Sequence, residues 1–225
     1  MTERVPYPDR AAAGRELAAE LVDHAGRPDL LVLGLPRGGV PVAARVAAGL
    51  AAPLDVLLVR KVGVPGQPEL AMGAVAVVGD RVAVARNQPV LGRIGLSEHD
   101  FGAGCVRELA VLRRRQSRYR AGHERVAGRP VVVVDDGLAT GSTMRAAVAV
   151  LRVAGALLVV AAAPIGAAST CRSLAGSVDA LVCPWQPTDF WAVSQGYQHF
   201  EQTTDDEVIE LLAGTAGPGP DSRHC

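Results

Sequence analysis

Residues 131–143 read Val-Val-Val-Val-Asp-Asp-Gly-Leu-Ala-Thr-Gly-Ser-Thr, and this stretch decides the fold class. Four β-branched residues in a row predict a strand that is buried on both faces, as in the centre of a parallel sheet. Two carboxylates follow directly, and a short loop leads into a helix that we expect over 142–153. Ligands of open α/β sheets bind beyond the carboxyl ends of the strands, so this junction is the first candidate for a site.

The rest of the chain continues this alternation of apolar runs and helical patterns. Further strands are expected at 30–33, 55–60, 157–162 and 180–182, and further helices at 10–24, 40–50, 97–120 and 205–212. A hairpin is expected at 74–78 and 81–85 around Gly79-Asp80, and the glycine- and proline-rich stretch 61–68 is expected to be a loop. This order predicts an α/β fold, with a Rossmann-like, open and mostly parallel sheet flanked by helices.

Composition favours one globular domain over residues 1–225 and excludes general disorder. The chain has no formal net charge, 49% hydrophobic residues and 20% charged residues. The polar start lacks the apolar core of a signal peptide, and the uncharged stretch 153–171 is interrupted by glycine and proline, so no membrane span is expected. Four cysteines without a CxxC pair indicate a reduced, cytoplasmic setting and no zinc site. The tail 214–225 is expected to be loose.

Charge is unevenly distributed along the chain. Residues 101–130 contain eight arginines and two glutamates, whereas residues 201–225 contain six acids and one arginine. A nucleic-acid footprint would require the basic residues to form one continuous surface patch. We favour a solvated helix face, so nucleic acid is not an expected partner.

The loop after the central strand has the features of an anion cradle. Gly137 and Gly141 permit sharp turns, and the free N–H groups of a helix start attract phosphate. Thr140, Ser142 and Thr143 add hydroxyl donors. Two adjacent acids beside such a cradle are costly unless they meet sugar hydroxyls or a metal ion. The pattern therefore indicates a phosphorylated sugar as the ligand.

Other phosphate motifs fit less well. A Walker A loop requires Gly-Lys before Ser or Thr, and Lys61 lies far from Gly141 in the sequence. The segment Gly34-Leu-Pro-Arg-Gly-Gly39 does not match the GxGxxG fingerprint. A phosphoaspartyl site stays open. Helix capping would explain one of the two acids, but not both.

The stretch 131–143 resembles the 5-phosphoribosyl-1-diphosphate (PRPP) signature of type I phosphoribosyltransferases. The resemblance implies that Asp135 and Asp136 hold the ribose 2′- and 3′-hydroxyls. It also implies that a run of small residues wraps the 5′-phosphate, namely Ala139, Thr140, Gly141, Ser142 and Thr143. The implied fold is the family core, about 28–183, with a small hood from 184–213 and a contribution of the N-terminal segment as a further option.

Two more segments strengthen the resemblance. Arg37, Gly38 and Gly39 match the family's pyrophosphate loop, and Arg60 and Lys61 lie where a strand enters the stretch 61–68. Cations there could contact pyrophosphate. The alternative for the first segment is an ordinary glycine turn. The alternative for Arg60 and Lys61 is solvated charge at a strand end. The stretch 131–143, together with LPRGGVPVA at 35–43 and FWAVSQGYQHF at 190–200, is similar to a subgroup of predicted phosphoribosyltransferases whose acceptor is undefined.

Aromatic residues gather after the last core strand, where the family places acceptor elements. Phe190, Trp191 and Tyr197 are the candidates for binding a planar acceptor, with Phe200 and His199 nearby. A satellite core or a contact between two copies in a homodimer explains the cluster equally well.

The resemblance implies Mg²⁺-dependent transfer of the phosphoribosyl group from PRPP to a small nitrogenous, nucleobase-like acceptor. The implied catalytic residues are Asp135, Asp136, Arg37 and Lys61. Magnesium would be held mainly by PRPP, with Asp135 or Asp136 as candidate ligands. Two rival functions stay open: a regulator of the same fold that senses PRPP or a nucleotide and binds nucleic acid, and an aspartate-based phosphatase.

Overall fold

The computed structural model describes residues 4–78, 81–95, 97–119 and 124–215. The expected turn at Gly79-Asp80 lies outside the described residues. So does most of the expected loose tail, whereas Gly214 and Thr215 belong to the last helix. Within the described residues, no helix is both long and apolar enough to cross a membrane.

The centre of the molecule is a five-stranded parallel sheet. Its strands lie in the order β2-β1-β6-β7-β8, and every neighbouring pair is parallel. The bounds are β1 (Leu31–Gly34), β2 (Leu54–Val56), β6 (Pro130–Val134), β7 (Leu158–Ala162) and β8 (Ala180–Val182). The apolar stretch that opened the sequence analysis is thus the central strand, and the predicted α/β fold class is confirmed.

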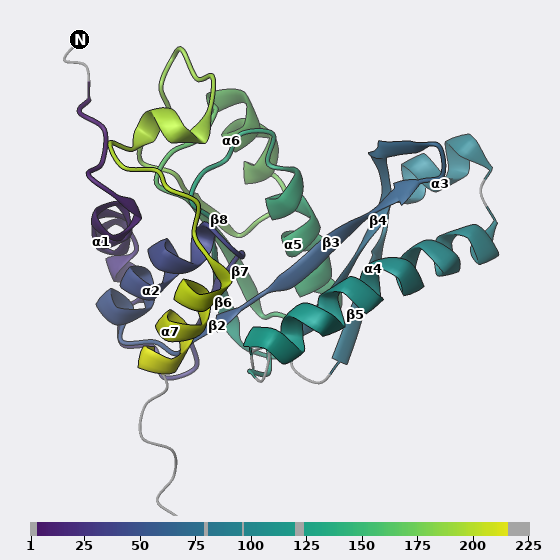
Figure 1. Ribbon diagram of the computed structural model, residues 1–225, viewed down its shortest axis with the longest axis horizontal. Coiled ribbons are helices and arrows are strands. Elements are labelled where there is room, and N and C mark those ends of the chain that lie inside the picture. Colours follow the sequence, from purple (N-terminus) through teal and green to yellow (C-terminus); the bar gives the residue numbers. More distant parts are fainter. Residues whose placement is uncertain (1–3, 79–80, 96, 120–123, 216–225) are drawn as a thin grey trace, which may run out of the picture.

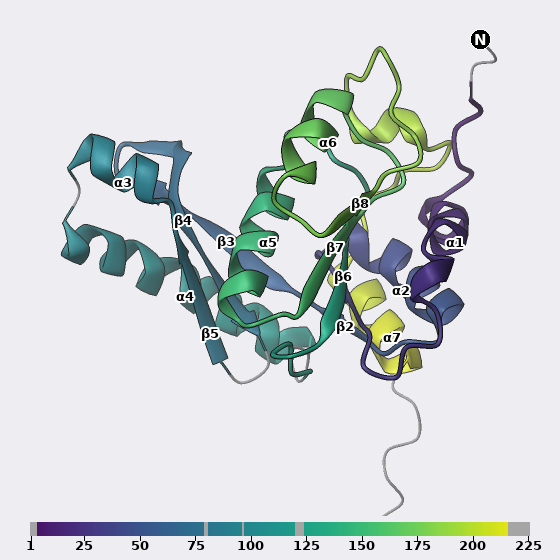
Figure 2. The ribbon, with the colours of Figure 1, turned by 180° about the vertical axis from the view of Figure 1, so that it is seen from behind.

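Helices cover both faces of this sheet (Figures 1 and 2). One face carries α1 (Arg10–Glu20), α2 (Gly39–Leu50) and α7 (Asp205–Thr215), and the other carries α5 (Ser142–Val153) and α6 (Ala168–Ala175). Side chains alternate along the strands, so Val132 and Val134 face α2 while Val131 and Val133 face α5. All of these valines are fully buried, which explains why the central strand is apolar throughout.

A second sheet forms the hood beside the parallel sheet (Figure 1). It is antiparallel and consists of β3 (Leu58–Val64), β4 (Gln67–Val78) and β5 (Arg81–Arg86). Helix α4 (Glu98–Tyr119) packs Phe101, Leu112 and Tyr119 against it, and α3 (Gln88–Ile94) follows β5. Thus the second sheet comes from residues that we had assigned to the core. Among the described residues, the segment 184–213 adds no strand to either sheet.

Two predictions about the chain around Lys61 are wrong. The stretch 61–68 is not a loop, because β3 continues to Val64, β4 begins at Gln67, and Pro65-Gly66 forms the turn. Gly66 has φ +77°, which a glycine adopts readily, so the Pro-Gly density marks one tight turn. The expected strand 55–60 is split, because the Leu57 N–H still bonds Gly34 while Leu58 already pairs with Val77 of β4.

The N-terminal segment and the segment around Tyr197 meet over the carboxyl edge of the parallel sheet. Tyr7 and Tyr197 form an isolated bridge, and the Tyr7 N–H donates to the Gly196 carbonyl at 2.8 Å. The short helix η2 (Val193–Gly196) lies in this segment, and its flank contacts the loop after β6, since a Cβ on Gly137 would overlap a Val193 methyl carbon. The segments around Tyr7 and Tyr197 therefore lie beside the loop after β6, where the sequence predicts a ligand.

Candidate functional site

The strand order places a crevice between β1 and β6. From β1 the chain crosses through α2 to β2 on one side, while β6 lies on the other side of β1. Gly34 and Val134 are register partners, so both strands end at the same level. Such a switch in strand order is where open α/β sheets bind ligands. The loops that follow β1 and β6 are the segments predicted to bind diphosphate and ribose phosphate.

These two loops are in direct contact. A Cβ on Gly38 would overlap Oδ2 of Asp136, and one on Gly39 would lie 2.6 Å from the Val134 carbonyl oxygen. The Leu35 N–H also donates to the Val134 carbonyl at 2.9 Å. The Pro36-Arg37 peptide bond in the first loop is cis. Only residues without a side chain allow this approach, which explains the Gly-Gly pair.

The two acids differ in their surroundings. Oδ1 of Asp135 accepts a hydrogen bond from the Asp136 N–H at 2.9 Å. Burial and the neighbouring Asp136 carboxylate raise the pKa of Asp135 well above its usual value. Oδ2 of Asp136 accepts a hydrogen bond from Nε of Arg10 at 2.9 Å and lies 2.8 Å from Nη2 in an ion pair. The pair therefore offers oxygen acceptors next to a buried carboxyl group that resists ionisation.

The loop before α5 is shaped as an anion cradle. Gly141 has φ +67°, and a Cβ there would lie 2.6 Å from a Thr170 methyl carbon, so glycine is required on two counts. The Thr170 hydroxyl donates to the Ala139 carbonyl at 2.6 Å and steadies the loop. Within the described residues, the N–H groups of Ala139, Thr140 and Gly141 have no acceptor. These features suit a phosphate at the helix start.

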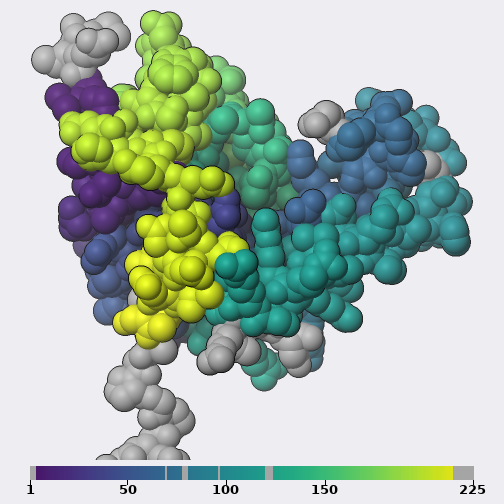
Figure 3. Space-filling model, in the orientation of Figure 1, coloured from purple at the N-terminus to yellow at the C-terminus, as the bar shows by residue number. Residues whose placement is uncertain are grey.

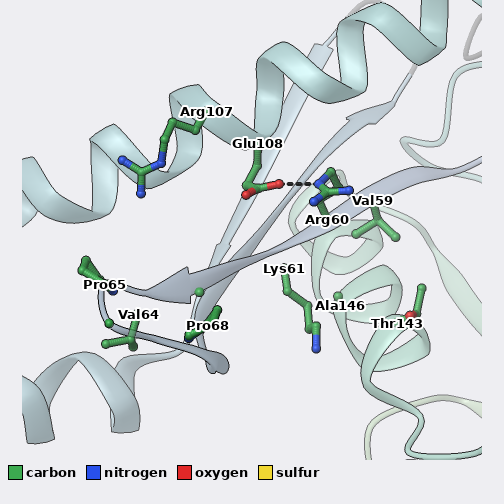
Figure 4. Close-up of a pocket in the computed structure, with 12 residues that line it drawn as sticks. Val59, Arg60, Lys61, Val64, Pro65, Pro68, Arg107, Glu108, Thr143 and Ala146 are labelled. Atoms are coloured by element: carbon green, nitrogen blue, oxygen red, sulfur yellow. Dashed lines mark hydrogen bonds and ion pairs between the residues drawn. The ribbon is translucent and has the colours of Figure 1, made fainter.

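Three predicted cations lie around this crevice, and their pairing differs. Arg37 lies 3.8 Å from Asp205, and Arg60 forms an ion pair with Glu108 of α4. Lys61 has no ion pair among the described residues, and it lines a pocket of about 590 Å³ together with Thr143. Figure 4 shows its side chain pointing toward the start of α5. Lys61 is thus the predicted cation best placed to meet a ligand.

The pocket includes residues that sequence reasoning did not single out. Arg107 and Glu108 line it from α4, and Figure 4 shows Glu108 engaged with Arg60. Figure 3 shows the hollow between the second sheet and α5. The arginine excess in 101–130 was the available signal for Arg107, but it does not tell which arginine faces a pocket. Arg10 gave no local signal, because its partner Asp136 is 126 residues away.

The structure places Tyr197, one of the predicted acceptor residues, inside the aromatic cluster. Its side chain is buried, with 6% exposed, and its hydroxyl donates to the Asp136 backbone carbonyl at 2.6 Å. Its ring stacks on Phe200 at 5.0 Å between centroids. The pKa of Tyr197 is raised mainly by burial and, to a smaller extent, by the negative charge of Asp136. Phe190 is half-buried against the same cluster, whereas Trp191 is 74% exposed. Tyr197 thus supports the loop after β6, and Phe190 and Trp191 are the predicted aromatic residues with more exposed surface.

Part of the basic stretch pairs with the acidic C-terminal stretch. Arg118 of α4 lies 2.9 Å from Asp205 and 3.7 Å from Asp206 of α7. Arg129 donates to the backbone carbonyl of Leu30 at 3.1 Å. Arg113, Arg114 and Arg115 are exposed. The charge asymmetry of the sequence therefore serves in part to join two helices.

Comparison with known proteins agrees with this geometry. The family model described as "Phosphoribosyl transferase domain" matches residues 6–181. Two Mycobacterium tuberculosis proteins, from strains CDC 1551 and H37Rv, are provisionally named phosphoribosyl transferases and are each 49% identical over 208 residues. The match covers 92% of this chain, and the chain spans about half (46%) of the length of these relatives.

A solved structure, that of TT1426 from Thermus thermophilus, resembles the whole fold. Its TM-score is 0.85 at 39% identity, over 95% of this chain and 100% of that chain. The family match covers most of the sequence, including the strands β1 and β6 and the loops that follow them. The predicted resemblance is thereby confirmed, and the chain belongs to the phosphoribosyl transferase domain family.

Proposed function

We propose that this protein transfers the 5-phosphoribosyl group of PRPP to a nitrogenous, nucleobase-like acceptor and releases pyrophosphate. Family membership indicates a transferase. The observation that carries the specific proposal is the contact between the two loops at the β1–β6 crevice, where Gly38 leaves no space for a Cβ beside Asp136. This contact brings a phosphate cradle, an acid pair and a diphosphate loop to one place.

Each part of PRPP has a matching group in the proposal. The 5′-phosphate binds the N–H groups and hydroxyls of 139–143, and the ribose hydroxyls donate to Asp135 and Asp136. The diphosphate meets the Arg37-Gly38-Gly39 loop and Lys61, which lines the adjoining pocket. The diphosphate on C1 and the hydroxyls on C2 and C3 are adjacent on the sugar, which agrees with the contact between Gly38 and Asp136.

The proposed reaction breaks the bond between C1 and the diphosphate oxygen and forms a bond from C1 to an acceptor nitrogen. The nitrogen supplies the electron pair of the new bond and loses its proton, which the released diphosphate accepts. The leaving diphosphate keeps the electron pair of the broken bond. Positive charge develops on the sugar, which the nearby carboxylates favour, and negative charge develops on the diphosphate, which Lys61 and Arg37 stabilise. Catalysis of this kind rests on positioning and on preorganised charge.

The donor set fits magnesium if the substrate supplies most of the ligands. Mg²⁺ prefers oxygen ligands and is commonly held by substrate phosphates with one or two carboxylates. Among the described residues, no group of three or more His, Cys, Asp or Glu side chains could hold a metal. Asp135 or Asp136 would add a carboxylate, and the bound ion would supply charge neutralisation at the diphosphate.

The acceptor side is proposed to involve the segment 184–213 with the N-terminal segment. These segments meet over the carboxyl edge of the sheet through the Tyr7–Tyr197 bridge. Exposed Trp191 and half-buried Phe190 supply aromatic surface for a planar ring.

The structure and the family match favour transfer over the two rival functions. Arg118 is paired with acids, and Arg107 faces the pocket, so these two arginines do not extend a surface patch for nucleic acid. An aspartate-based phosphatase has less support, because the family model that matches residues 6–181 is a phosphoribosyl transferase domain.

A binding measurement with charge-matched variants tests the proposal. The double variant Asp135→Asn/Asp136→Asn is expected to weaken PRPP binding by more than about 100-fold, because two charge-assisted hydrogen bonds of about 1.5–3 kcal/mol each are lost. Isothermal titration calorimetry measures the affinity. The control Asp23→Asn/Asp29→Asn makes the same charge change at exposed positions near the opposite end of β1 and should bind as the parent does.

Unchanged PRPP affinity in the Asp135/Asp136 double variant would refute the ribose assignment. A screen for PRPP-dependent pyrophosphate release across purines, pyrimidines, small amines and carboxylates then identifies the acceptor.

A further inference from the structure

Arg10 contacts one carboxylate oxygen of Asp136 and does not contact the other. Nε of Arg10 donates to Oδ2 at 2.9 Å, and Nη2 lies 2.8 Å from the same oxygen in an ion pair. Arg10 does not reach Oδ1 of Asp136, and the neighbour that interacts with the Asp136 side chain besides Arg10 is the carboxyl group of Asp135. The two side chains are only 12% and 16% exposed, so solvent screens the pair weakly.

Arg10 is itself fixed on three sides. Its Nη1 donates to the Glu201 carbonyl at 2.7 Å, and its guanidinium carbon lies 3.9 Å from the ring centroid of Phe200. It is the first residue of α1, whose start is capped by the Asp9 carboxylate. A planar guanidinium stacks on a ring and donates at its edge in the same geometry, which an ammonium group cannot do.

The backbone of Asp136 is held from the same side of the molecule. The buried Tyr197 hydroxyl donates to its carbonyl at 2.6 Å, and Tyr197 stacks on Phe200. Thus Tyr197 holds the backbone of Asp136 directly, and Phe200 helps to hold the Asp136 carboxylate by packing against Arg10.

We infer that Arg10 is a positioning residue for sugar recognition, which rests on the proposed function. By occupying Oδ2, Arg10 fixes the carboxylate plane and presents Oδ1 to a ribose hydroxyl. Without the guanidinium the carboxylate rotates between orientations, and the hydrogen bond to the hydroxyl loses its fixed direction. Arg10 thereby sets how strongly the site prefers a sugar with both hydroxyls.

The test compares sugars that differ by one hydroxyl. Ribose 5-phosphate and its 2-deoxy and 3-deoxy analogues are titrated into the full chain by calorimetry. The proteins are the parent, Arg10→Met, Arg10→Lys and the control Arg4→Met. Arg4 is a matched control because it also stacks on the aromatic cluster, over Tyr7 at 5.0 Å, yet it makes no contact with Asp135 or Asp136 among the described residues. Thermal melting confirms that each variant is folded.

The parent should prefer ribose 5-phosphate over at least one analogue by about 10-fold or more, as expected for a hydrogen bond to a carboxylate. In Arg10→Met this preference should fall below about 3-fold, with Arg10→Lys in between and Arg4→Met unchanged. A purely structural loss would weaken binding of all three sugars equally and leave the ratio intact. If Arg10→Met does not fold, Arg10→Lys carries the same test.

Three results would overturn the inference, and they are distinguishable. A parental preference that survives in Arg10→Met shows that Arg10 does not position Asp136. Tighter binding of ribose 5-phosphate by Arg10→Met shows that Arg10 competes with the sugar instead. A parent without any preference removes the ribose assignment of the proposed function, and the inference falls with it.

Discussion

Gly38 and Asp136 show how little space separates the two ligand loops. The carboxylate oxygen of Asp136 occupies the position where a Cβ on residue 38 would lie, and Arg10 holds that same oxygen from another direction. The carboxylate therefore cannot move aside without breaking the ion pair. A single methyl group at residue 38 should therefore weaken ligand binding.

We expect Gly38→Ala to weaken PRPP binding by roughly 10- to 100-fold, because overpacking costs about 1–3 kcal/mol and about 1.4 kcal/mol equals a factor of ten. Gly92→Ala in α3 is the control, since a Cβ there meets nothing within 4 Å. Calorimetric titration measures both. A Gly38→Ala protein that binds PRPP as the parent does would show that the loops separate freely.

Single residues of the site were predictable only where the signal was local. Asp135, Asp136 and the run 139–143 follow a buried strand directly, so their shared position at its carboxyl end could be read from the sequence. Arg10 could not be predicted, because its role depends on a partner 126 residues away. The burial of Tyr197 could not be predicted, because the sequence shows that aromatic residues gather at 185–200 but not which of their rings is buried.

Among elements, β3 and α4 together supply the cationic side of the crevice. Lys61 of β3 and Arg107 of α4 line the pocket, and Glu108 neutralises Arg60. Lys61 belongs to a paired strand and not to a loop, so its position is set by the register Lys61–Ala74. A cation on a strand contributes more to binding than one on a mobile loop, because less order must be imposed on it.

Lys61→Ala should weaken binding of pyrophosphate by about 10- to 100-fold, the loss expected for a hydrogen bond between charged groups. Binding of ribose 5-phosphate should change by less than about 3-fold, since its phosphate lies at 139–143 in the proposal. Arg113→Ala, an exposed change on α4, serves as the control. An equal loss for both ligands would place Lys61 elsewhere in the site.

The elements of the parallel sheet were predicted closely. In the second sheet the hairpin expected at 74–78 and 81–85 is confirmed as the pairing of β4 with β5, whereas the course of β3 and the start of β4 were not predicted. Helix 142–153 and strand 180–182 were predicted with their observed bounds, because an apolar period and a turn signal coincide there. The apolar run across Leu57 gives no sign that the chain leaves one sheet for another. The proline and glycine residues at 65–68 indicated a loop, although they form the turn between β3 and β4. The short helices α3 and α6 were not predicted.

At the scale of the whole molecule, α4 and α7 connect the second sheet to the parallel one. Asp205 accepts a hydrogen bond from the Tyr119 hydroxyl at 2.6 Å and pairs with Arg118. Burial, and then Asp205, raise the pKa of Tyr119 to about 12, so the phenol remains a donor at physiological pH. The Tyr119 hydroxyl, and then Arg118 and Arg37, hold the pKa of Asp205 below its usual value.

Asp205→Asn should therefore lower the melting temperature at pH 7 by about 1–4 °C, as expected for a partly exposed pair worth up to about 1 kcal/mol. A lowered pKa means that the contribution is full at neutral pH and is lost as the pH falls through that lowered pKa. The difference from the parent should thus vanish in strong acid. Asp206→Asn changes the same charge in the same helical turn and should have a smaller effect, since Asp206 is 83% exposed. Equal shifts for both variants, or a difference that persists in strong acid, would contradict this account.

The contact between Arg10 and the carbonyl of Glu201 joins residues 191 positions apart. The contact lasts only while both segments stay docked, and terminal segments open more easily than buried strands. Fraying at either end would release Arg10 while β1 and β6 stay paired. If Arg10 positions Asp136 as we infer, a proteolytic nick ahead of α1 or a bulky fusion there should impair sugar recognition in a molecule that still melts as one unit.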